Sequence, residues 1–425
     1  MADVVIPEEA SEPLPPPVPV PVARPIRDVI ASADFRRYWL AQFLAALGNG
    51  ALRFVFVWLA LDLSESPAAP GALGIALGVP ALVLMMPAGV WSDRLDRRRL
   101  IIATQAVAAV VLGAAAVATW AGVMSIGLAA VFAAVLGGVL ALSAPAFQAL
   151  VPSLVPPERL MTGVALQGMG QNAALLFGAV AGGGAIAVAG IGGGFAVLGI
   201  LQAIAVLAMW QVRLAPQAQQ PRRGMRGDIR DGMRFALGRE PLRSLLAIGL
   251  LAGFTWGIVS ILLPEVAKDE LRAGAFATSL LFSALGAGLF LTSMVLASRR
   301  TIRRPGLLIA VSISTLLGGG VVVMGLSRSY ALTFVVMLAW GVGGGTSMTL
   351  QRGLLQRHTP DEMMGRVMAL ASLAMTGSFP VAAGAASVLS STLGPADALV
   401  ATGVGAVVVA VLVGWRPAIR AATDE

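Results

Sequence analysis

The sequence predicts an all-α integral membrane protein with twelve transmembrane helices, arranged as two six-helix pseudo-repeats. Of its 425 residues, 57% are hydrophobic and only 12% are charged, and the mean hydropathy is +0.84. A soluble domain carries roughly twice that share of charge, about 25%, so most of this chain must face lipid. Apolar runs close to the roughly 20 residues that cross a bilayer as a helix recur along the whole chain. The longest polar interruption, 213–243, divides these runs into two halves.

The apolar runs place the expected spans at 39–62, 71–92, 100–120, 124–146, 161–188, 191–212, 244–266, 274–297, 305–326, 330–352, 364–392 and 395–415. The remaining segments divide the chain into a disordered, proline-rich cytoplasmic tail at 1–34, a first half at 35–212, a cytoplasmic linker at 213–243, a second half at 244–416 and a cytoplasmic tail at 417–425. Within the linker an apolar residue recurs every fourth position, which is typical of an amphipathic helix on a membrane surface; a solvated linker is the alternative. These residues are Met225, Ile229, Met233 and Leu237.

The excess of basic residues reflects topology and not nucleic acid binding. The net charge is +8 and the sequence pI is near 11.2. Arginines concentrate in the segments that join the spans on one side, whereas the other side receives Lys268, Arg272 and Arg328. The positive-inside rule places the arginine-rich side in the cytoplasm. With an even number of spans, both termini then lie in the cytoplasm.

The chain offers no recognisable catalytic or cofactor site. It contains no cysteine, so disulfides and thiolate metal sites are excluded, and His358 is its only histidine. No phosphate loop of the Walker type occurs, which argues against ATP hydrolysis. We therefore expect neither an enzyme nor a metal or cofactor protein. Its energy would come from an ion gradient, a substrate gradient or a separate subunit.

The two halves contain similar segments at equivalent positions. VPPERLMTGVAL at 155–166 follows the fourth expected span, and HTPDEMMGRVMAL at 358–370 follows the tenth. Aligning the two segments places Pro156 on Pro360 and Glu158 on Glu362. Parallel repeats of this kind predict a duplicated six-helix bundle with a binding site between the halves.

The turn between the second and third spans, GVWSDRLDRR at 89–98, is densely charged. Anchoring of the cytoplasmic side explains its arginines. Anchoring does not explain why Asp93 stands at the helix end. It also does not explain Gly89, one turn earlier, where another helix could approach closely. We interpret the turn as an ion-paired cytoplasmic gate, with a plain positive anchor as the alternative. The gate residues are Gly89, Asp93, Arg94, Arg97 and Arg98.

Arg53 is the only ionisable residue deep within an expected span, where an arginine costs roughly 2.5–3.5 kcal/mol on insertion scales. Asn49 lies one turn away on the same helix face. We expect both to face a cavity, where Arg53 would bind an anionic or polar group of a substrate; a structural arginine is the alternative.

Asp62 and Glu265 are the acids nearest the membrane core on the outer side. They would take up protons if burial disfavours their charged forms, or simply end their helices in water.

Other polar and aromatic residues within the spans are candidates for lining the same cavity. Gln167 and Gln171 share a face of the fifth expected span, where their amides would bind a ligand or join neighbouring helices. Phe254, Trp256 and Trp340 would form an aromatic wall suited to amphipathic or planar molecules, with packing inside the bundle as the alternative.

The charged turn resembles the signature of the major facilitator superfamily, which runs G-x-L-a-D-R-x-G-R-R between the second and third spans. The five gate residues match it, while Trp91 stands at the usual leucine and Asp96 at the usual glycine. The form DRLDRRRL resembles the branch that includes enterobactin exporters and related bacterial efflux carriers. The same branch is indicated by FRRYWLAQFLAALG at 35–48, LVPSLVPPERL at 150–160, EPLRSLL at 240–246 and PDEMMGRVMAL at 360–370. The resemblance covers about 35–416.

The resemblance implies a secondary transporter of the bacterial inner membrane that exports small amphipathic molecules, drug-like or siderophore-like, by alternating access. It would act as a monomer coupled to protons, with Asp93 as the acid of the gate. Two positions depart from the antiporter pattern. Ala179 stands where proline is expected, and 124–146 lacks the arginine typical of drug–proton antiporters. Uptake of a metabolite or lipid by the same fold, and a non-transporting membrane partner or sensor, are the alternatives.

Overall fold

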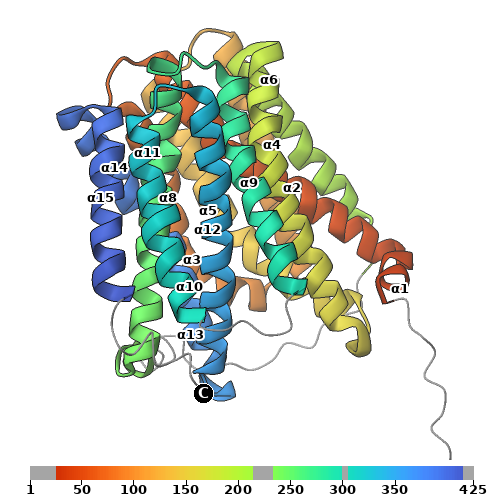
Figure 1. Cartoon of the computed structure of the whole chain (residues 1–425). Helices are drawn as coiled ribbons and strands as arrows, with labels where there is room; N and C mark the ends of the chain where they lie inside the picture. The colour runs from red at the N-terminus through yellow and green to blue at the C-terminus, as the bar shows by residue number, and fades with distance from the viewer. Residues whose placement is uncertain (1–24, 214–232, 299–304, 415–425) are drawn as a thin grey trace, which may run out of the picture.

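The computed structural model describes residues 25–213, 233–298 and 305–414, and all the regular elements in these ranges are helices (Figure 1). The all-α prediction is therefore confirmed. Ten of the described helices are long and apolar enough to cross a membrane. We call the end of the molecule that holds Pro25 and Gly414 the terminal end, and the end that holds the connections 64–68 and 270–274 the opposite end.

Helices of the first half pack with one another as a first group. This group consists of α1 (Pro25–Ala31), α2 (Ala33–Leu63), α3 (Ala69–Arg94), α4 (Arg97–Trp120), α5 (Ile126–Leu154), the short 3-10 helix η1 (Pro157–Arg159) and α6 (Leu160–Trp210). Within it α2 packs against α6, α3 against α5, and α4 against both α5 and α6. The pairing of helices that are distant in sequence makes this group a bundle.

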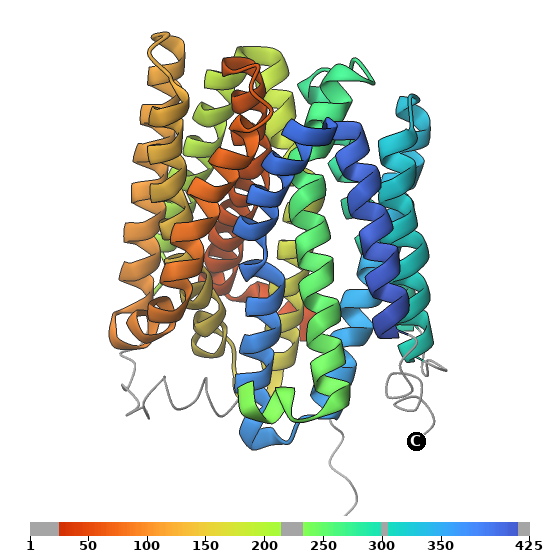
Figure 2. The ribbon, with the colours of Figure 1, turned by 90° about the vertical axis from the view of Figure 1, so that its left-hand side faces the viewer.

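Helices of the second half form a second group. It consists of α8 (Glu240–Asp269), α9 (Ala275–Ser298), α10 (Pro305–Val311), the π-helical segment η2 (Ser312–Gly319), α11 (Gly320–Leu326), α12 (Tyr330–Arg357), α13 (Asp361–Gly377), α14 (Phe379–Leu393) and α15 (Pro395–Gly414). In this group α9 packs against α12, and α15 packs against α8 and α11. Figure 2 shows the two groups side by side, with α3 of the first beside α14 of the second.

The helix α6 contains a sharp turn at Ala189 and Gly190, where the backbone is not helical. Gly190 has a φ of +68°, a conformation that glycine adopts without steric strain. Ile186 and Gly194 lie on either side of the turn, and a Cβ at Gly194 would be 2.9 Å from Ile186 Cγ1. In a straight helix eight residues span about 12 Å. The chain therefore folds back, and α6 consists of two limbs that coincide with the expected spans 161–188 and 191–212.

Buried apolar side chains form one large core near the opposite end and two smaller cores near the terminal end. The large core draws on both groups and includes Phe56, Leu73, Phe195, Leu262, Leu281 and Ala383. One small core belongs to the first group alone, around Tyr38 and Leu150. The other belongs to the second group alone, around Ile309 and Leu354. The two groups thus share a core only toward the opposite end.

Small residues bring the two groups together along two helix pairs, α3 with α14 and α6 with α9. At Gly71 a Cβ would meet the Ser387 side chain within 3.0 Å, and at Gly286 it would lie 2.7 Å from Leu176 Cα. At the opposite end, Lys268 Nζ donates to the carbonyl oxygen of Leu61. Ser387 Oγ donates to the Ala68 carbonyl oxygen at 3.3 Å. The contacts of Gly71, Lys268 and Ser387 hold the groups together at the opposite end, and that of Gly286 lies farther along α9, beside a cavity between the groups.

Part of the segment expected as a tail, 1–34, is helical. Arg36 Nη1 donates to the carbonyl oxygens of Ile30 and Ala31 at 2.9 and 3.0 Å, which satisfies the end of α1. Asp28 pairs with Arg159 at 3.1 Å, fixing α1 to η1. Residues 1–24, the linker positions Met225 and Ile229, and the tail at 417–425 lie outside the described residues.

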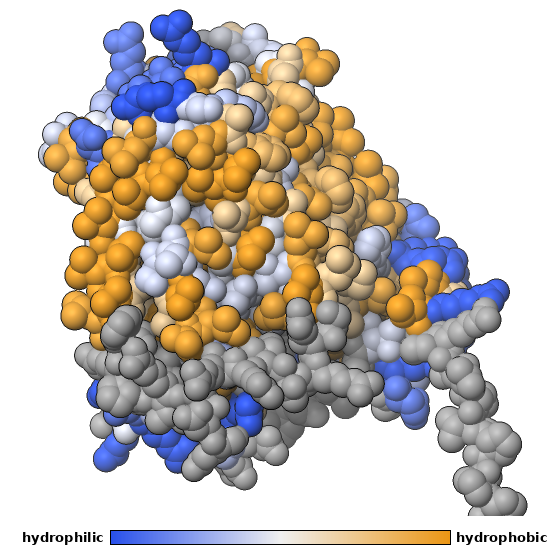
Figure 3. Space-filling model, in the orientation of Figure 1, coloured by the Kyte–Doolittle hydropathy of each residue, from blue (hydrophilic) through white to orange (hydrophobic). Residues whose placement is uncertain are grey.

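The flank of the molecule is apolar, as a lipid-facing surface requires. Figure 3 shows hydrophobic side chains over much of the side of the bundle, with hydrophilic ones at the opposite end and, at the terminal end, around α1. Exposed side chains on the flank include Val110 at 72%, Val117 at 63% and Leu412 at 66%. Because exposed valine and leucine are unfavourable in water but not in lipid, this surface agrees with a protein that spans the bilayer.

We expect Gly341→Ala to lower the free energy of unfolding by about 1–3 kcal/mol, the range for overpacking a close contact. A Cβ there would lie 2.1 Å from the Leu285 carbonyl oxygen, so α9 and α12 would have to separate. Gly353→Ala is the matched control on α12, because its Cβ would meet no atom within 4 Å. Thermal unfolding of the purified protein, followed by tryptophan fluorescence, measures both. Equal unfolding temperatures for the two variants would contradict this account of the α9–α12 contact.

Candidate functional site

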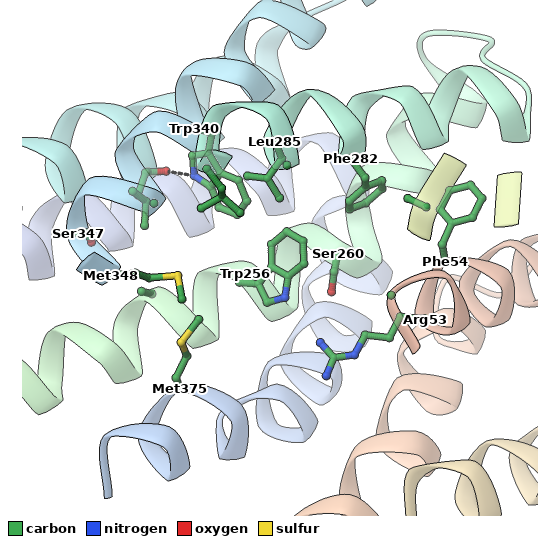
Figure 4. Close-up of a pocket in the computed structure, with 17 residues that line it drawn as sticks. Arg53, Phe54, Trp256, Ser260, Phe282, Leu285, Trp340, Ser347, Met348 and Met375 are labelled. Atoms are coloured by element: carbon green, nitrogen blue, oxygen red, sulfur yellow. Dashed lines mark hydrogen bonds between the residues drawn. The ribbon is translucent and has the colours of Figure 1, made fainter. Parts of the chain in front are cut away.

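A cavity of about 190 Å³ lies between the two groups. The first group contributes α2 and α6 to its wall, and the second contributes α8, α9, η2, α12 and α13. Its lining is mostly apolar, and Arg53 is the one charged side chain among the described residues that line it. Figure 4 shows Arg53 at one side of this cavity and Met348 and Met375 at the other. We call it the central cavity.

Aromatic rings form much of the wall of the central cavity. Trp256 stacks on Trp340 with ring centroids 5.7 Å apart, and Phe282 meets the edge of Trp256 at 6.2 Å. Phe54 of the first group contacts Phe282 edge-on at 6.0 Å. Trp340 Nε1 donates to the Leu317 carbonyl oxygen in η2 at 2.9 Å. The hydrogen bond satisfies the indole N–H and fixes the buried Trp340 ring, which is stacked on Trp256.

Arg53 has an aromatic contact but no acidic partner. Its guanidinium carbon lies 4.1 Å from the centroid of the Phe379 ring. Among the described residues none forms a hydrogen bond or an ion pair with Arg53. A cation–π contact contributes about 0.5–2 kcal/mol, less than the cost of an arginine within a membrane span. The site therefore retains a positive charge beside the cavity that no described acid neutralises.

The structure brings three of the predicted site residues together. Arg53, Trp256 and Trp340 all line the central cavity. Asn49 does not; it accepts a hydrogen bond of 3.5 Å from Gln202 Nε2 on the second limb of α6. Phe254 also lies away from the lining and packs, partly buried, on the shared apolar core.

The two predicted glutamines of the fifth span lie apart from the cavity lining. Gln167 is buried, and its Nε2 donates to the Tyr38 hydroxyl at 2.9 Å. The Tyr38 hydroxyl in turn donates to the Phe147 carbonyl oxygen at 2.7 Å. Gln167 thus joins α6, α2 and α5 through hydrogen bonds. Gln171 is exposed and does not line the central cavity.

The two predicted protonation sites differ in environment. Asp62 is exposed at the end of α2. Glu265 is 6% exposed on α8, and both of its carboxylate oxygens lie 3.1 Å from Ser390 Oγ on α14. Neither residue lines the central cavity. A proton exchanged at Glu265 would act on the packing of α8 against α14 and not directly on a bound molecule.

The predicted gate is described only in part. Arg97 Nη1 donates to the Ala149 carbonyl oxygen at 2.9 Å. Arg98 donates to the carbonyl oxygens of Met209, at 3.3 Å, and Trp210. These bonds tie the start of α4 to the ends of α5 and α6 within the first group. The surroundings of Gly89 and the side chains of Asp93 and Arg94 are not described, so the gate remains a prediction.

Several lining residues were not predicted from the sequence. They are Phe54, Ser260, Phe282, Ser347, Met348 and Met375. Apolar and hydroxyl residues are common throughout the spans, so residue type alone does not distinguish them. Phe54 follows Arg53 directly, and Ser260 lies one turn after Trp256; proximity to a predicted residue was the only available signal. For Met348 and Met375 the sequence carries none.

The described helices form two groups with a cavity between them, and a comparison with known families identifies the fold. The model of the Major Facilitator Superfamily matches residues 38–385. The chain belongs to this superfamily. The prediction of a membrane transporter of this family is therefore confirmed.

Curated relatives of this superfamily member include the enterobactin exporter EntS. The protein is 24% identical to EntS of Shigella boydii serotype 18 over 382 residues, which cover 89% of this chain and 90% of the relative. EntS of Escherichia coli O139:H28 matches with the same identity and coverage.

Solved structures support the fold. A bacterial homologue of the human lysosomal transporter Spinster, in an inward-facing and occupied conformation, superposes with a TM-score of 0.66 at 15% identity. The superposition covers 92% of this chain and 97% of the Spinster homologue's chain. A mutant of the nucleoside transporter NupG superposes with a TM-score of 0.71 at 13% identity, covering 90% and 100% of the two chains.

We expect Arg53→Met to leave the unfolding temperature unchanged or to raise it, because no described acid loses a partner and a costly charge leaves the membrane interior. Tyr38→Phe on the same helix is the control, since it leaves the Phe147 carbonyl oxygen and Gln167 without their hydroxyl partner. It should cost about 1–3 kcal/mol. A large fall in the unfolding temperature for Arg53→Met would identify Arg53 as a structural residue instead.

Proposed function

We propose that this protein is a secondary transporter that exports small amphipathic molecules bearing an anionic group by alternating access. The observation that carries the proposal is Arg53, a cation without a described acidic partner beside a cavity between two helix groups. A membrane protein retains such a charge at a cost, so we assign it to binding. The proposed cargo completes the missing ion pair.

The wall of the central cavity fits the apolar part of such a cargo. The rings of Trp256, Trp340 and Phe282 all line the cavity and give its wall an apolar, aromatic surface. Planar or aromatic groups would pack against them with favourable stacking, while a carboxylate, sulfonate or phenolate would reach the forked guanidinium of Arg53. Pockets of this composition, mainly apolar with few polar groups, are usual for small-molecule sites.

The relatives support the direction of transport and the class of cargo. The EntS proteins are named as exporters of enterobactin, a siderophore, and match over nine tenths of their length. At 24% identity they favour export of a siderophore-like or drug-like molecule by this chain without fixing its identity. The same comparison favours the bacterial inner membrane as its location.

Twelve crossings with both termini in the cytoplasm agree with the helices described. Ten described helices are candidate spans, and counting the two limbs of α6 separately and adding the apolar helix α3 would bring the number to twelve. Arginines that face the terminal end support its assignment to the cytoplasmic side by the positive-inside rule. They include Arg36, Arg37, Arg98, Arg99, Arg159, Arg239, Arg243 and Arg357. The described state would then be open toward the cytoplasm and ready to load cargo.

Proton coupling is the energy source that we favour, with Glu265 as the first candidate carrier of the proton and Asp62 as the second. Glu265 lies beside the contact between α3 and α14, through its partner Ser390 on α14. A change in its charge would alter the packing that holds the opposite end closed. Asp93 would act at the other end, as the acid of the cytoplasmic gate, in a carrier that works as a monomer.

The function is tested by the accumulation of dyes, antibiotics and siderophores in cells that lack or overproduce the protein. We expect overproduction to lower the accumulation of anionic amphipathic compounds, and a protonophore to abolish the effect. Arg53→Gln should raise their accumulation toward that of cells lacking the protein, with less effect on cationic compounds. Higher accumulation on overproduction would show uptake. No change for any compound would contradict export of this class of cargo.

Alternating access predicts that locking the opposite end stops transport. Cysteines at Gly71 and Ser387 would place their Cβ atoms 3.0 Å apart, close to the roughly 3.8 Å that a disulfide needs. The chain has no other cysteine to compete. We expect mild oxidation of the double variant to stop transport and a reductant to restore it. Single-cysteine variants are the controls. Transport at an unchanged rate after complete crosslinking would contradict opening at this end.

A further inference from the structure

A second cavity, of about 90 Å³, lies within the second group between α8, α12 and α13. It is lined on the side of the terminal end by Leu355 of α12 and Met368 of α13. It shares Met348 and Met375 with the central cavity. We call it the vestibule. The two cavities therefore meet at this methionine pair, and Figure 4 shows the two thioethers projecting toward one another.

The vestibule is more polar than the central cavity. Its lining includes Gln351, Arg352, Ser372 and Thr376. Gln351 is buried and fixed, because its Nε2 donates to the Leu245 carbonyl oxygen at 2.6 Å. Arg352, Ser372 and Thr376 are exposed. Among the described residues none forms a hydrogen bond or ion pair with Arg352. The vestibule thus combines hydroxyl groups at its mouth with a guanidinium that pairs with none of the described residues.

Methionines are well suited to a passage that must open and close. The side chain is unbranched and has three rotatable bonds, so it changes shape at low energetic cost and accepts varied apolar surfaces. Met348 and Met375 are both half-buried and come from different helices, α12 and α13. A rotation of either side chain would widen the connection without moving a helix.

We propose that the vestibule is the capture site for the anionic end of the cargo, bound by Arg352, and that the cargo reaches Arg53 by passing between Met348 and Met375. The chemical class is an amphipathic molecule with a carboxylate, sulfonate or phosphate group, which a guanidinium binds through paired hydrogen bonds. That this cargo is then exported rests on the function proposed above. The capture site and the path between the two methionines do not depend on that proposed function.

Arg352 and Arg53, placed one after the other along the path, explain how an anion crosses an apolar passage. Leaving water for a cavity lined by tryptophan, leucine and methionine costs an anion free energy unless a cation receives it. Arg352 draws the anion to the mouth, where exposed charge raises the local concentration of an oppositely charged ligand. Arg53 receives it on the far side of the methionine pair. The apolar part of the cargo follows along the aromatic wall.

The charge effect is tested with a reporter cysteine in the central cavity. Ser260 lines that cavity, and Ser260→Cys would be the only cysteine in the chain. Its labelling rate is measured in purified protein with two methanethiosulfonates of similar size, one anionic (sulfonatoethyl) and one cationic (trimethylammonioethyl). We expect Arg352→Gln to lower the ratio of the anionic to the cationic rate by about three- to tenfold.

The matched control for charge is Arg357→Gln. Arg357 is exposed on the same helix but lines neither cavity. It should leave the ratio unchanged. An equal fall of the ratio in both variants would show a general surface charge effect and overturn the role of Arg352. No labelling of Ser260→Cys by either reagent would overturn the path itself.

The passage is tested by filling it. Met348→Trp and Met375→Trp should each slow the labelling of Ser260→Cys by both reagents about tenfold or more, because the indole occupies the connection. Met294→Trp is the matched control, since Met294 is 58% exposed on α9 and lines neither cavity. Gel filtration and unfolding temperature establish that each variant is folded. Unchanged labelling in both folded tryptophan variants would overturn the passage.

These outcomes separate the inference from the proposed function. Labelling is read from the protein alone, without cargo and without a gradient. If the protein shows the expected labelling pattern but exports no compound, the vestibule proposal stands and the export proposal is rejected. If the protein exports anionic compounds but its labelling rates do not depend on Arg352 or the methionines, the export proposal stands and the vestibule proposal is rejected.

Discussion

The apolar core shared by the two helix groups near the opposite end is the interaction on which the rest of the structure depends. Phe56, Leu73, Leu262 and Ala383 belong to it, and it joins helices from both halves of the chain. Toward the terminal end this single core is replaced by two, one in each group. Each group is therefore held together by its own side chains there, and the space between them is free to hold a cavity. In lipid there is little hydrophobic gain from joining two apolar helices, so the close contacts at Gly71 and Gly286 supply the attraction by packing.

The same arrangement explains why a charge is tolerated at Arg53. A guanidinium exposed to lipid would face a solvent that offers no hydrogen bonds, whereas one between the groups faces a cavity and the ring of Phe379. The buried polar network around Tyr38 has the opposite character. Its hydroxyl and the Gln167 amide are paired with one another and with the Phe147 carbonyl oxygen, and they stabilise the first group without facing the cavity. Gln167 and Tyr38 are thus paired and fix helices, whereas Arg53 has no described acidic partner and faces the cavity.

Hydropathy alone predicted the helical class and the positions of most helices, because crossing lipid imposes a length and a composition that are visible in the sequence. The reversal at Gly190 fell where two expected spans met. Of the cavity residues, Arg53 was predictable because a charge is conspicuous in an apolar span. Met348 and Met375 were not, because which apolar side chains face a cavity depends on how each helix is rotated against its neighbours. For Gln167 the sequence left binding and packing open, since an amide serves either purpose, and only its distance to Tyr38 distinguishes them.

The charge of Arg53 also has a consequence for the response to voltage. A guanidinium remains protonated at any physiological pH, so the empty carrier holds a positive charge within the membrane field. A full elementary charge moved across 100 mV changes the free energy by about 2.3 kcal/mol, and the proposed alternating access would move part of that charge. A monoanion bound beside Arg53, as proposed above, would cancel it. Under the proposed function the loaded and the empty carrier would therefore respond differently to the membrane potential, and the potential would drive or oppose the return of the empty carrier.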